Sequence, residues 1–365
     1  MRPVSVLLLY AQSDVNKTFS YQYGWPRKFL DHPRFRCTAL NVVDRGWEAF
    51  FERYKSLWTG RFDALVILHS VFSNGCYLRP RHLLFHAVKA LRLPKAYFIG
   101  NEYKLMPEKM AFCDALGISL LVSQSNSPAV HRLYRERLNC AVAGIPSAGL
   151  DTTVFYPQIP RGERHIDIGY RSDESPIYLG HMERRHIADY FLEHGPRYGL
   201  NMNISLKQVD RFAEPEWAAF LNQCRGQLGT EAGGDYFELT DATRKAYMRY
   251  VKRHRTATDE EILGRFFKDY KDPVAMRVLS GRIVEAAGTK TLQILFEGRY
   301  NDYFKPDVHY IALKRDFSNF DQVMEKFRDE NYCRMLTDNA YELAIKELTY
   351  DKLIDKFYDA LAPLL

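Results

Sequence analysis

A short stretch in the last quarter of the chain combines residue types that suit a charged, hydroxyl-rich ligand. Ser280, Gly281 and Arg282 open a segment with the pattern of a short helix, which ends near Gly288. The free amides at the start of a helix attract anions, and Arg282 adds a positive charge there. Glu285 lies about a turn and a half further on, where its carboxylate can accept hydrogen bonds from vicinal hydroxyls, such as those of a ribose. This combination suits a nucleoside diphosphate.

The elements that must position these residues are those of an α/β protein. Ser280 suits an N-cap, because its hydroxyl can accept a hydrogen bond from a free amide of the first turn. An apolar run of strand length, Leu292–Phe296, follows the helix and stops before Gly298. Strands alternate with helices along the chain, starting with Val4–Tyr10 and Phe62–His69. This alternation predicts doubly wound parallel sheets.

The same stretch resembles the second domain of GT-B glycosyltransferases, in the group-1 or spore-coat (CgeB-like) branch. The resemblance is carried by Arg282-Ile-Val-Glu285-Ala-Ala-Gly-Thr289 ahead of a strand. A second segment, Leu150-Asp-Thr-Thr-Val-Phe-Tyr-Pro157, is similar to the one with which these enzymes leave their first domain. The resemblance implies two Rossmann-like domains that face a cleft, with a terminal helix crossing back to the first domain.

Length and composition agree with two domains. A chain of 365 residues, 46% hydrophobic and 26% charged, is too long for one ordinary core. We predict a first Rossmann-like domain on the acceptor side over residues 1–155, with a helix at Gly46–Tyr54. The second domain, on the donor side, spans residues 156–347 and carries a helical insertion at about 235–276. Residues 348–365 form a C-terminal helix that packs back on the first domain.

The resemblance implies roles for individual residues of the second domain. It assigns Glu285 to the ribose of the nucleotide and the start of the helix to the diphosphate. In the better-known branch a second glutamate lies eight positions earlier and serves the donor sugar, and this chain has Arg277 there. Glu231, which follows a predicted strand, is the candidate replacement. The alternative is that Glu231 binds the amides of its own loop.

Further donor-side candidates lie in loops after predicted strands, where an open α/β sheet binds its ligands. Arg171 is a candidate for the phosphates, and Arg184 and Arg185 are weaker candidates for the same role. Asn301 and Lys305 are candidates for contacts with the sugar or the phosphates. Each of them could instead have a purely structural role.

Three residues at predicted strand ends of the first domain are candidates for the reaction itself. His69, Asn101 and Glu102 could activate an acceptor hydroxyl or stabilise an oxocarbenium ion. Each of these residues has a structural alternative as well.

The remaining composition restricts cofactors and location. No Asp-x-Asp motif, P-loop or zinc-site pattern is present, and the six cysteines are scattered without a Cys-x-x-Cys pair. Together with this, the resemblance to GT-B enzymes implies no metal and no cofactor, with a UDP- or GDP-linked sugar as substrate. No stretch of 18 apolar residues could span a bilayer. The expected location is cytoplasmic, and no nucleic acid partner is expected.

A basic run within the predicted insertion is the main surface feature. Residues 244–255 hold six lysines or arginines and no acid, in a chain with a formal net charge of +6. The run could contact an anionic acceptor or the inner face of a membrane, or it could be a solvated helix face.

These observations predict a glycosyltransferase. The enzyme would move a sugar from a nucleotide diphosphate donor to a glycan, a glycolipid or another hydroxyl acceptor, with retention of anomeric configuration and without a metal. One alternative is a nucleotide-sugar epimerase on the same scaffold. Another is a non-catalytic protein that binds glycans or polyanions.

Overall fold

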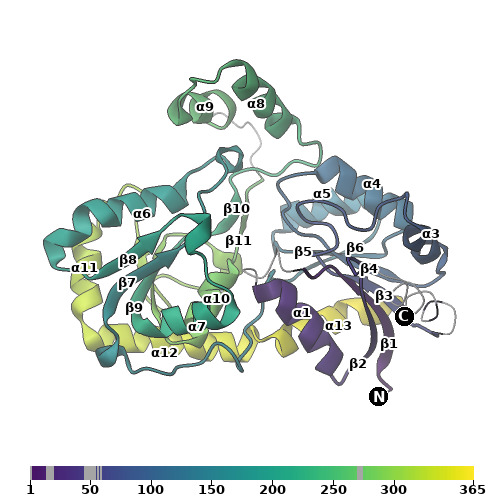
Figure 1. Ribbon diagram of the computed structural model, residues 1–365, viewed down its shortest axis with the longest axis horizontal. Helices are drawn as coiled ribbons and strands as arrows, with labels where there is room; N and C mark the ends of the chain where they lie inside the picture. The colour runs from purple at the N-terminus through teal and green to yellow at the C-terminus, as the bar shows by residue number, and fades with distance from the viewer. Residues whose placement is uncertain (1, 14–19, 45–54, 56, 58–59, 269–273) are drawn as a thin grey trace. The chain divides into compact units, whose positions relative to one another are not determined.

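The computed structural model describes residues 2–13, 20–44, 55, 57, 60–268 and 274–365 (Figure 1). The chain divides into two compact units. The first comprises Met1–Ser147 together with Phe237–Ala242 and Tyr350–Leu365. The second comprises Ala148–Tyr236 and Thr243–Thr349. Each unit has its own parallel sheet and its own buried core.

The described residues of the first unit form a six-stranded sheet in the order β2-β1-β3-β4-β5-β6. All neighbouring strands are parallel, and β1, β3, β4 and β5 are almost entirely buried, as expected for a sheet covered on both faces. The strands are β1 (Val4–Tyr10), β2 (Phe35–Asn41), β3 (Ala64–Ile67), β4 (Lys95–Phe98), β5 (Leu120–Ser123) and β6 (Ala141–Gly144).

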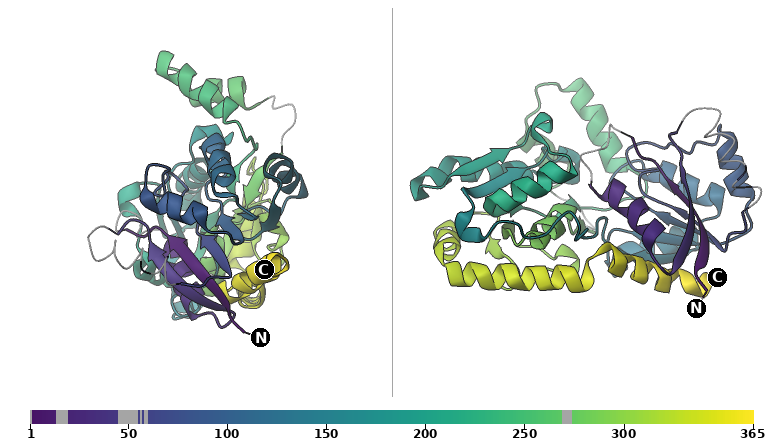
Figure 2. Two further views of the ribbon diagram at one scale, coloured as in Figure 1. Left: turned by 90° about the vertical axis from the view of Figure 1, so that its right-hand side faces the viewer. Right: turned by 60° about the horizontal axis from the view of Figure 1, so that its bottom comes forward.

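Helices cover both faces of this first sheet. Neighbouring residues of β4 point to opposite faces. The ring of Tyr97 packs 5.4 Å from Phe112 in α4, whereas the ring of Phe98 packs 5.1 Å from Trp25 in α1 and 5.0 Å from Phe357 in α13. Helices α1 and α13 therefore lie side by side on one face (Figure 2). The described helices are α1 (Ser20–Asp31), α3 (Leu83–Ala90), α4 (Met106–Leu116), α5 (Pro128–Leu138) and α13 (Tyr350–Leu361).

The second unit is built on a five-stranded parallel sheet in the order β13-β12-β9-β7-β8, as far as the described residues show. After β7 the chain adds β8 on one side, and it then returns to place β9 on the other side of β7. The order of the strands therefore reverses between β7 and β9. The strands are β7 (Ile166–Arg171), β8 (Met202–Ser205), β9 (Cys224–Gly229), β12 (Leu292–Phe296) and β13 (Ile311–Leu313).

Helices also cover both faces of the second sheet. Leu228 of β9 belongs to a core that includes Phe191 of α6 and Phe327 of α11. The next residue towards the N-terminus, Gln227, points to the other face and donates to the Arg282 carbonyl of α10 at 3.2 Å. The helices are α6 (Glu183–His194), α7 (Glu214–Gln223), α10 (Gly281–Gly288), α11 (Phe320–Arg328) and α12 (Glu330–Glu347).

A helical segment separates the two halves of this unit in the sequence. The short antiparallel strands β10 (Ala232–Gly234) and β11 (Met276–Val278) flank it. Between them lie α8 (Ala242–Arg253) and α9 (Asp259–Phe266), within the predicted insertion.

The predicted fold class is confirmed. Two α/β units with parallel sheets are present, and β1 and β12 have the predicted bounds. Helix α10 also forms where the pattern predicted a short helix. The helix predicted at Gly46–Tyr54 lies outside the described residues.

Candidate functional site

The C-terminal edge of the second sheet carries polar side chains at the point where the strand order reverses. Ligands of an open α/β sheet bind at this point, outside the carboxyl ends of the strands. Ser172 and Asp173 directly follow β7 there. Helix α6 begins at Glu183, and α10 begins at Gly281. Residues far apart in the sequence therefore meet at one edge of the sheet.

Three arginines gather around one aspartate beside the end of β7. Arg184 pairs with Asp173 at 2.6 Å, and Arg211 approaches the same carboxylate at 3.9 Å. Arg282 donates to the hydroxyl of Ser172 at 3.0 Å. We call Arg184, Arg211, Arg282 and Asp173 the arginine cluster. The positive charges of Arg211 and Arg184 repel that of Arg282, which favours the binding of an anion.

Burial and neighbouring charges shift the pKa values of Arg282 and Asp173 in the arginine cluster. Burial, followed by the positive charges of Arg211 and Arg184, lowers the pKa of Arg282 to about 10. Burial alone would raise the pKa of Asp173, but the arginines of the cluster hold it below its usual value. Arg282 and Asp173 are therefore both charged at neutral pH. An incoming anion would relieve the repulsion among the guanidinium groups.

The start of α10 lies next to the arginine cluster in the sequence. Ser280 has the extended backbone of an N-cap, but among the described residues its side chain makes no capping hydrogen bond, so this predicted interaction is absent. The amide of Ile283 instead donates to the Ser280 carbonyl at 3.1 Å and closes the first turn. At Gly281, an added Cβ would lie 2.8 Å from Cβ of Ala148, so this close approach requires glycine.

Glu285 lies three residues after Arg282, on the same side of α10. Its buried carboxylate accepts a hydrogen bond at 2.7 Å from Nε1 of Trp217 in α7. The ring of Trp217 also lies 6.0 Å from the guanidinium of Arg282. One indole therefore contacts both the carboxylate predicted for a ribose and the cation predicted for a phosphate.

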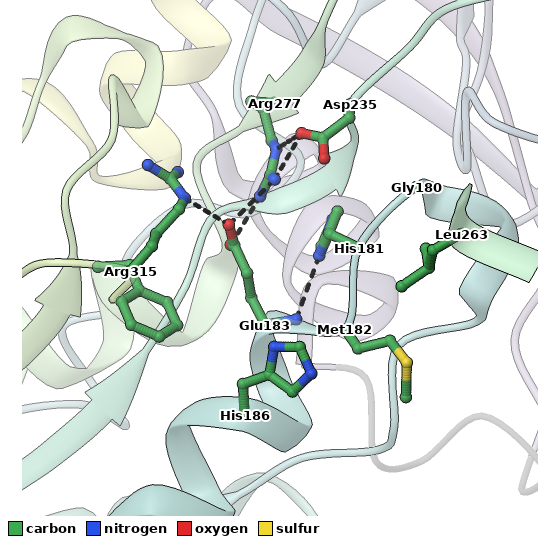
Figure 3. Close-up of a pocket in the computed structure, with 10 residues that line it drawn as sticks. Gly180, His181, Met182, Glu183, His186, Asp235, Leu263, Arg277 and Arg315 are labelled. Carbon is green, nitrogen blue, oxygen red and sulfur yellow. Dashed lines mark hydrogen bonds and ion pairs between the residues drawn. The ribbon is translucent and has the colours of Figure 1, made fainter. Parts of the chain in front are cut away.

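A pocket of about 560 Å³ opens at the same edge of the sheet (Figure 3). Its volume lies within the range of about 300–1,000 Å³ that is typical of small-molecule sites. Helices α6 and α9, strand β11 and the ends of β10, β12 and β13 contribute side chains to it. The lining residues are Gly180, His181, Met182, Glu183, His186, Asp235, Leu263, Arg277, Phe296 and Arg315.

Glu183 is the centre of an ion-pair network in this pocket (Figure 3). Arg277 donates to both of its oxygens, at 2.7 and 3.1 Å, and Nε of Arg315 donates at 2.6 Å. Asp235 accepts from Nε of Arg277 at 2.7 Å. Burial alone would raise the pKa of Glu183, but Arg277 above all lowers it to about 2. We call Glu183, Asp235, Arg277 and Arg315 the balanced network, because each of its two arginines is paired with a carboxylate.

The balanced network changes the interpretation of Arg277. Arg277 occupies the position at which the resembled family has its second glutamate, and the structure brings a carboxylate to it from α6. Glu183 and Asp235 were not among the predicted site residues. The signal in the sequence was Arg277 itself. A guanidinium that becomes buried requires acidic or carbonyl partners, so Arg277 in place of a glutamate pointed to carboxylates from elsewhere in the chain.

Glu231, the predicted replacement for that glutamate, binds the amides of a neighbouring loop. Its Oε1 accepts from the amides of Arg299 and Tyr300 at 3.1 and 2.8 Å. Tyr300 and Asn301 have left-handed φ values of 47° and 54°, a conformation that costs a non-glycine residue roughly 1–3 kcal/mol. Asn301 supports the same turn by accepting from the amide of Leu279 at 2.8 Å. These contacts favour a structural role for Glu231 and Asn301.

Arg171 directs its side chain to β8, and Lys305 lies in the loop before β13. The guanidinium of Arg171 donates to the carbonyl and side chain of Asn203, at 2.8 and 2.6 Å, and lies 4.6 Å from the ring of Phe220. Lys305 is exposed in a loop that an ion pair of 2.8 Å ties to Lys326, in the last turn of α11. That turn lies at the opposite edge of the sheet, because α11 runs back from the C-terminal end of β13. Neither placement supports the predicted contact with phosphates.

His69 lies just after β3 in the first unit, in a cage of aromatic rings. The rings of Tyr21, Phe98 and Trp25 lie 5.4, 5.8 and 6.0 Å from its imidazole. Burial lowers its pKa to about 4, although a hydrogen bond with the backbone of Ser147 opposes this shift. Nε2 has no hydrogen-bond partner among the described residues. His69 is therefore neutral at pH 7 and has one nitrogen left for an acceptor or a donor.

Glu102, the third residue predicted for the reaction, accepts hydrogen bonds within the first unit. Its carboxylate accepts from Tyr134, Ser123 and the amide of Gln124, at 2.6, 2.8 and 2.7 Å. Burial raises its pKa to about 7, and these donors oppose the shift. The contacts favour a structural role.

Asn101 occupies the same loop and also has local partners. It has a left-handed φ of 48°, donates to Asn74 at 2.5 Å and accepts from Tyr103 at 3.0 Å. The buried Lys109, which sequence analysis missed, donates to the carbonyls of Gly100, Asn101 and Lys104 at 2.5–2.9 Å. The ammonium group of Lys109 thus fixes the backbone of this loop.

Two features of the described residues bear on metals and membranes. No group of three or more His, Cys, Asp or Glu side chains within them could hold a metal ion. Among the helices that the structure describes, none has both the length and the apolar character of a membrane-spanning segment.

Comparison with known structures places the fold in the GT-B class. HepE from Anabaena in complex with UDP superposes with a TM-score of 0.55 at 12% identity, over 99% of this chain and 100% of that chain. HepE in complex with UDP-glucose gives a TM-score of 0.52 at 11% identity, with the same coverage. Sucrose-phosphate synthase from Thermosynechococcus elongatus gives 0.51 at 10% identity, again over 99% and 100% of the two chains. No family model and no curated protein matches the sequence.

Proposed function

We propose that this protein is a glycosyltransferase that uses a nucleotide diphosphate sugar as donor. The observation that carries the proposal is the arginine cluster beside Glu285, joined through Trp217. Glu285, for the ribose hydroxyls, and Arg282, for the phosphates, lie on one face of α10 at the ligand-binding edge of a parallel sheet, and Arg184 of α6 adds a second positive charge nearby. HepE of the same fold was solved with UDP-glucose, which supports UDP as the nucleotide to test before GDP.

The arginine cluster would act on the leaving group. In sugar transfer the bond between C1 of the sugar and the β-phosphate oxygen breaks, and the acceptor oxygen forms the new bond to C1. The acceptor proton passes to the departing phosphate oxygen when attack occurs from the same face, which retains the anomeric configuration. Arg282 and Arg184 would stabilise the negative charge that grows on the diphosphate. They would supply the stabilisation that other enzymes obtain from a divalent metal.

The first unit would supply the acceptor side. His69 is the strongest of the three predicted residues there, because its buried Nε2 lacks a partner among the described residues. A neutral imidazole can accept or donate a hydrogen bond, whereas the carboxylate of Glu102 is already occupied. We therefore assign contact with the sugar or acceptor hydroxyl to His69.

The exposed side of α8 would contact an anionic acceptor, such as a lipid-linked glycan at the inner face of a membrane. Arg249, Lys252 and Arg253 are exposed there and have no ion-pair partner among the described residues. Each such cation near an anionic surface contributes about 1 kcal/mol of attraction.

Two assays test the proposal. Thermal unfolding with a panel of nucleoside diphosphates should show a stabilising nucleotide, because a ligand at about 100 times its Kd adds about 2.7 kcal/mol to the free energy of unfolding. Product analysis of the donor alone and the donor with an acceptor then distinguishes the activities. Sugar transfer only with an acceptor supports the proposal, whereas an isomerised donor without any acceptor would identify an epimerase. Salt-sensitive binding of polyanions without nucleotide binding would identify a binding protein.

A further inference from the structure

The pocket of the balanced network differs from the arginine cluster in charge, although Glu183 and Arg184 are consecutive in α6. The side chain of Arg184 turns to Asp173, and that of Glu183 turns to Arg277. In the arginine cluster the charges of Arg211 and Arg184 repel that of Arg282. In the balanced network Arg277 and Arg315 are paired with Glu183 and Asp235, and the nearby Glu231 adds negative charge. The two neighbouring sites therefore suit ligands of different charge.

The polar groups of the pocket suit vicinal hydroxyls. A hydroxyl both donates and accepts, so it can donate to a carboxylate and accept from a guanidinium. Glu183, Asp235 and Arg315 offer both kinds of group within one pocket, beside the apolar side chains of Met182 and Phe296. A carboxylate on the ligand would lack a free positive partner in this pocket. Arg277 and Arg315 are already paired with Glu183.

We infer that this pocket binds an uncharged hexose of the donor and that Glu183 is its specificity-determining carboxylate. The inference rests on the proposed function, because the arginine cluster must hold the diphosphate for the sugar to reach the pocket. It names the substrate class as neutral nucleotide sugars and excludes nucleotide-linked uronic acids. Arg277 is a positioning residue, since it grips both oxygens of Glu183 without being needed for direct contact with the sugar.

The test measures Kd by calorimetric titration of the full chain with UDP, UDP-glucose and UDP-glucuronic acid. The wild type should bind UDP-glucose about tenfold more tightly than UDP-glucuronic acid, the difference expected from one unpaired charge. Glu183→Gln should keep its affinity for UDP within about twofold, lose affinity for UDP-glucose about tenfold and gain affinity for UDP-glucuronic acid, because Arg277 and Arg315 are then uncompensated. Glu193→Gln, an exposed position on the same helix, is the matched control and should change nothing.

Asp235→Asn provides a second variant, because its side chain is 48% exposed and its loss leaves Glu183 paired. It should shift the preference in the same direction as Glu183→Gln. A wild type that prefers UDP-glucuronic acid would overturn the inference, and so would a Glu183→Gln variant that weakens UDP and UDP-glucose by equal factors. In both of these results UDP still binds, so the proposed function survives. A wild type that binds none of these three ligands, and neither GDP nor GDP-glucose, would refute the proposed function and the inference with it.

Discussion

The arginine cluster and the balanced network lie at one edge of one sheet, yet they differ in how their charges interact. Like charges repel in the first, and opposite charges pair in the second. In the arginine cluster, burial and the positive charges of Arg211 and Arg184 lower the pKa of Arg282 to about 10. In the balanced network each charge has a partner, and the pKa of Glu183 falls to about 2. A site in which cations repel one another favours an anionic ligand. A site in which the cations are paired with carboxylates offers directional hydrogen bonds to an uncharged ligand. This difference teaches which part of a nucleotide sugar each region would hold.

Removing a charge from the arginine cluster should have the largest effect. We expect Arg282→Met to weaken UDP binding by about tenfold to a hundredfold, because hydrogen bonds to charged groups contribute about 1.5–3 kcal/mol each. Calorimetric titration with UDP measures the change. Arg197→Met is the matched control, since Arg197 is an exposed arginine in the turn that follows α6. Equal losses in both variants would show that general charge, rather than the cluster, attracts the nucleotide.

Glu285 should contribute a smaller and more specific effect. Glu285→Gln keeps an oxygen that can accept from Trp217, so the fold should be retained. The wild type should bind UDP about tenfold more tightly than its 3′-deoxy analogue, and the variant should bind both with nearly equal affinity. Titration of both ligands against both proteins completes the cycle. If the variant still distinguishes the two nucleotides, the ribose lies elsewhere.

The pH dependence of stability should separate Glu183 from the buried Glu102 of the first unit. The pKa of Glu183 is lowered from 4.5 to about 2, so its stabilisation is present above about 4.5 and is lost as the pH falls towards 2. The pKa of Glu102 is raised from 4.5 to about 7, so its contribution is present below about 4.5 and is lost as the pH rises through 7. Urea unfolding of Glu183→Gln and Glu102→Gln beside the wild type should show differences that change with pH in opposite directions. Parallel changes would contradict these environments.

The smallest effect on nucleotide binding is expected outside both regions. Arg171→Met should lower the free energy of unfolding by about 1–3 kcal/mol, because the partners of the buried guanidinium lose their donors. Its Kd for UDP should remain that of the wild type. Urea unfolding and titration together measure the two quantities. If the variant lost UDP binding at unchanged stability, Arg171 would contact the phosphates, as the sequence predicted.

Local sequence patterns were sufficient for the elements but not for the site. The apolar run at Leu292–Phe296 became β12 with the same bounds, and the segment from Gly281 became a helix. These predictions depend on periodicity and on breaking residues within a few positions. The capping bond of Ser280 was predicted from the same local rule and is absent among the described residues, because residue type does not determine the orientation of a hydroxyl.

The partners of the arginines could not be predicted from spacing. Glu183 meets Arg277 across 94 positions, and Ser172 meets Arg282 across 110 positions. Such pairs form only after β7, α6 and α10 have packed, and no periodic pattern encodes them. Glu231 shows the same limit from the other side. Its position at a strand end predicted a ligand contact, but its carboxylate accepts hydrogen bonds from the amides of Arg299 and Tyr300.

A crystal structure with UDP bound tests the central claim most directly. The account predicts that the two phosphates lie between Arg282, Arg184 and the hydroxyl of Ser172, with the ribose hydroxyls on Glu285. Phosphates bound to the cations of α8, or to any surface remote from α10, would contradict it.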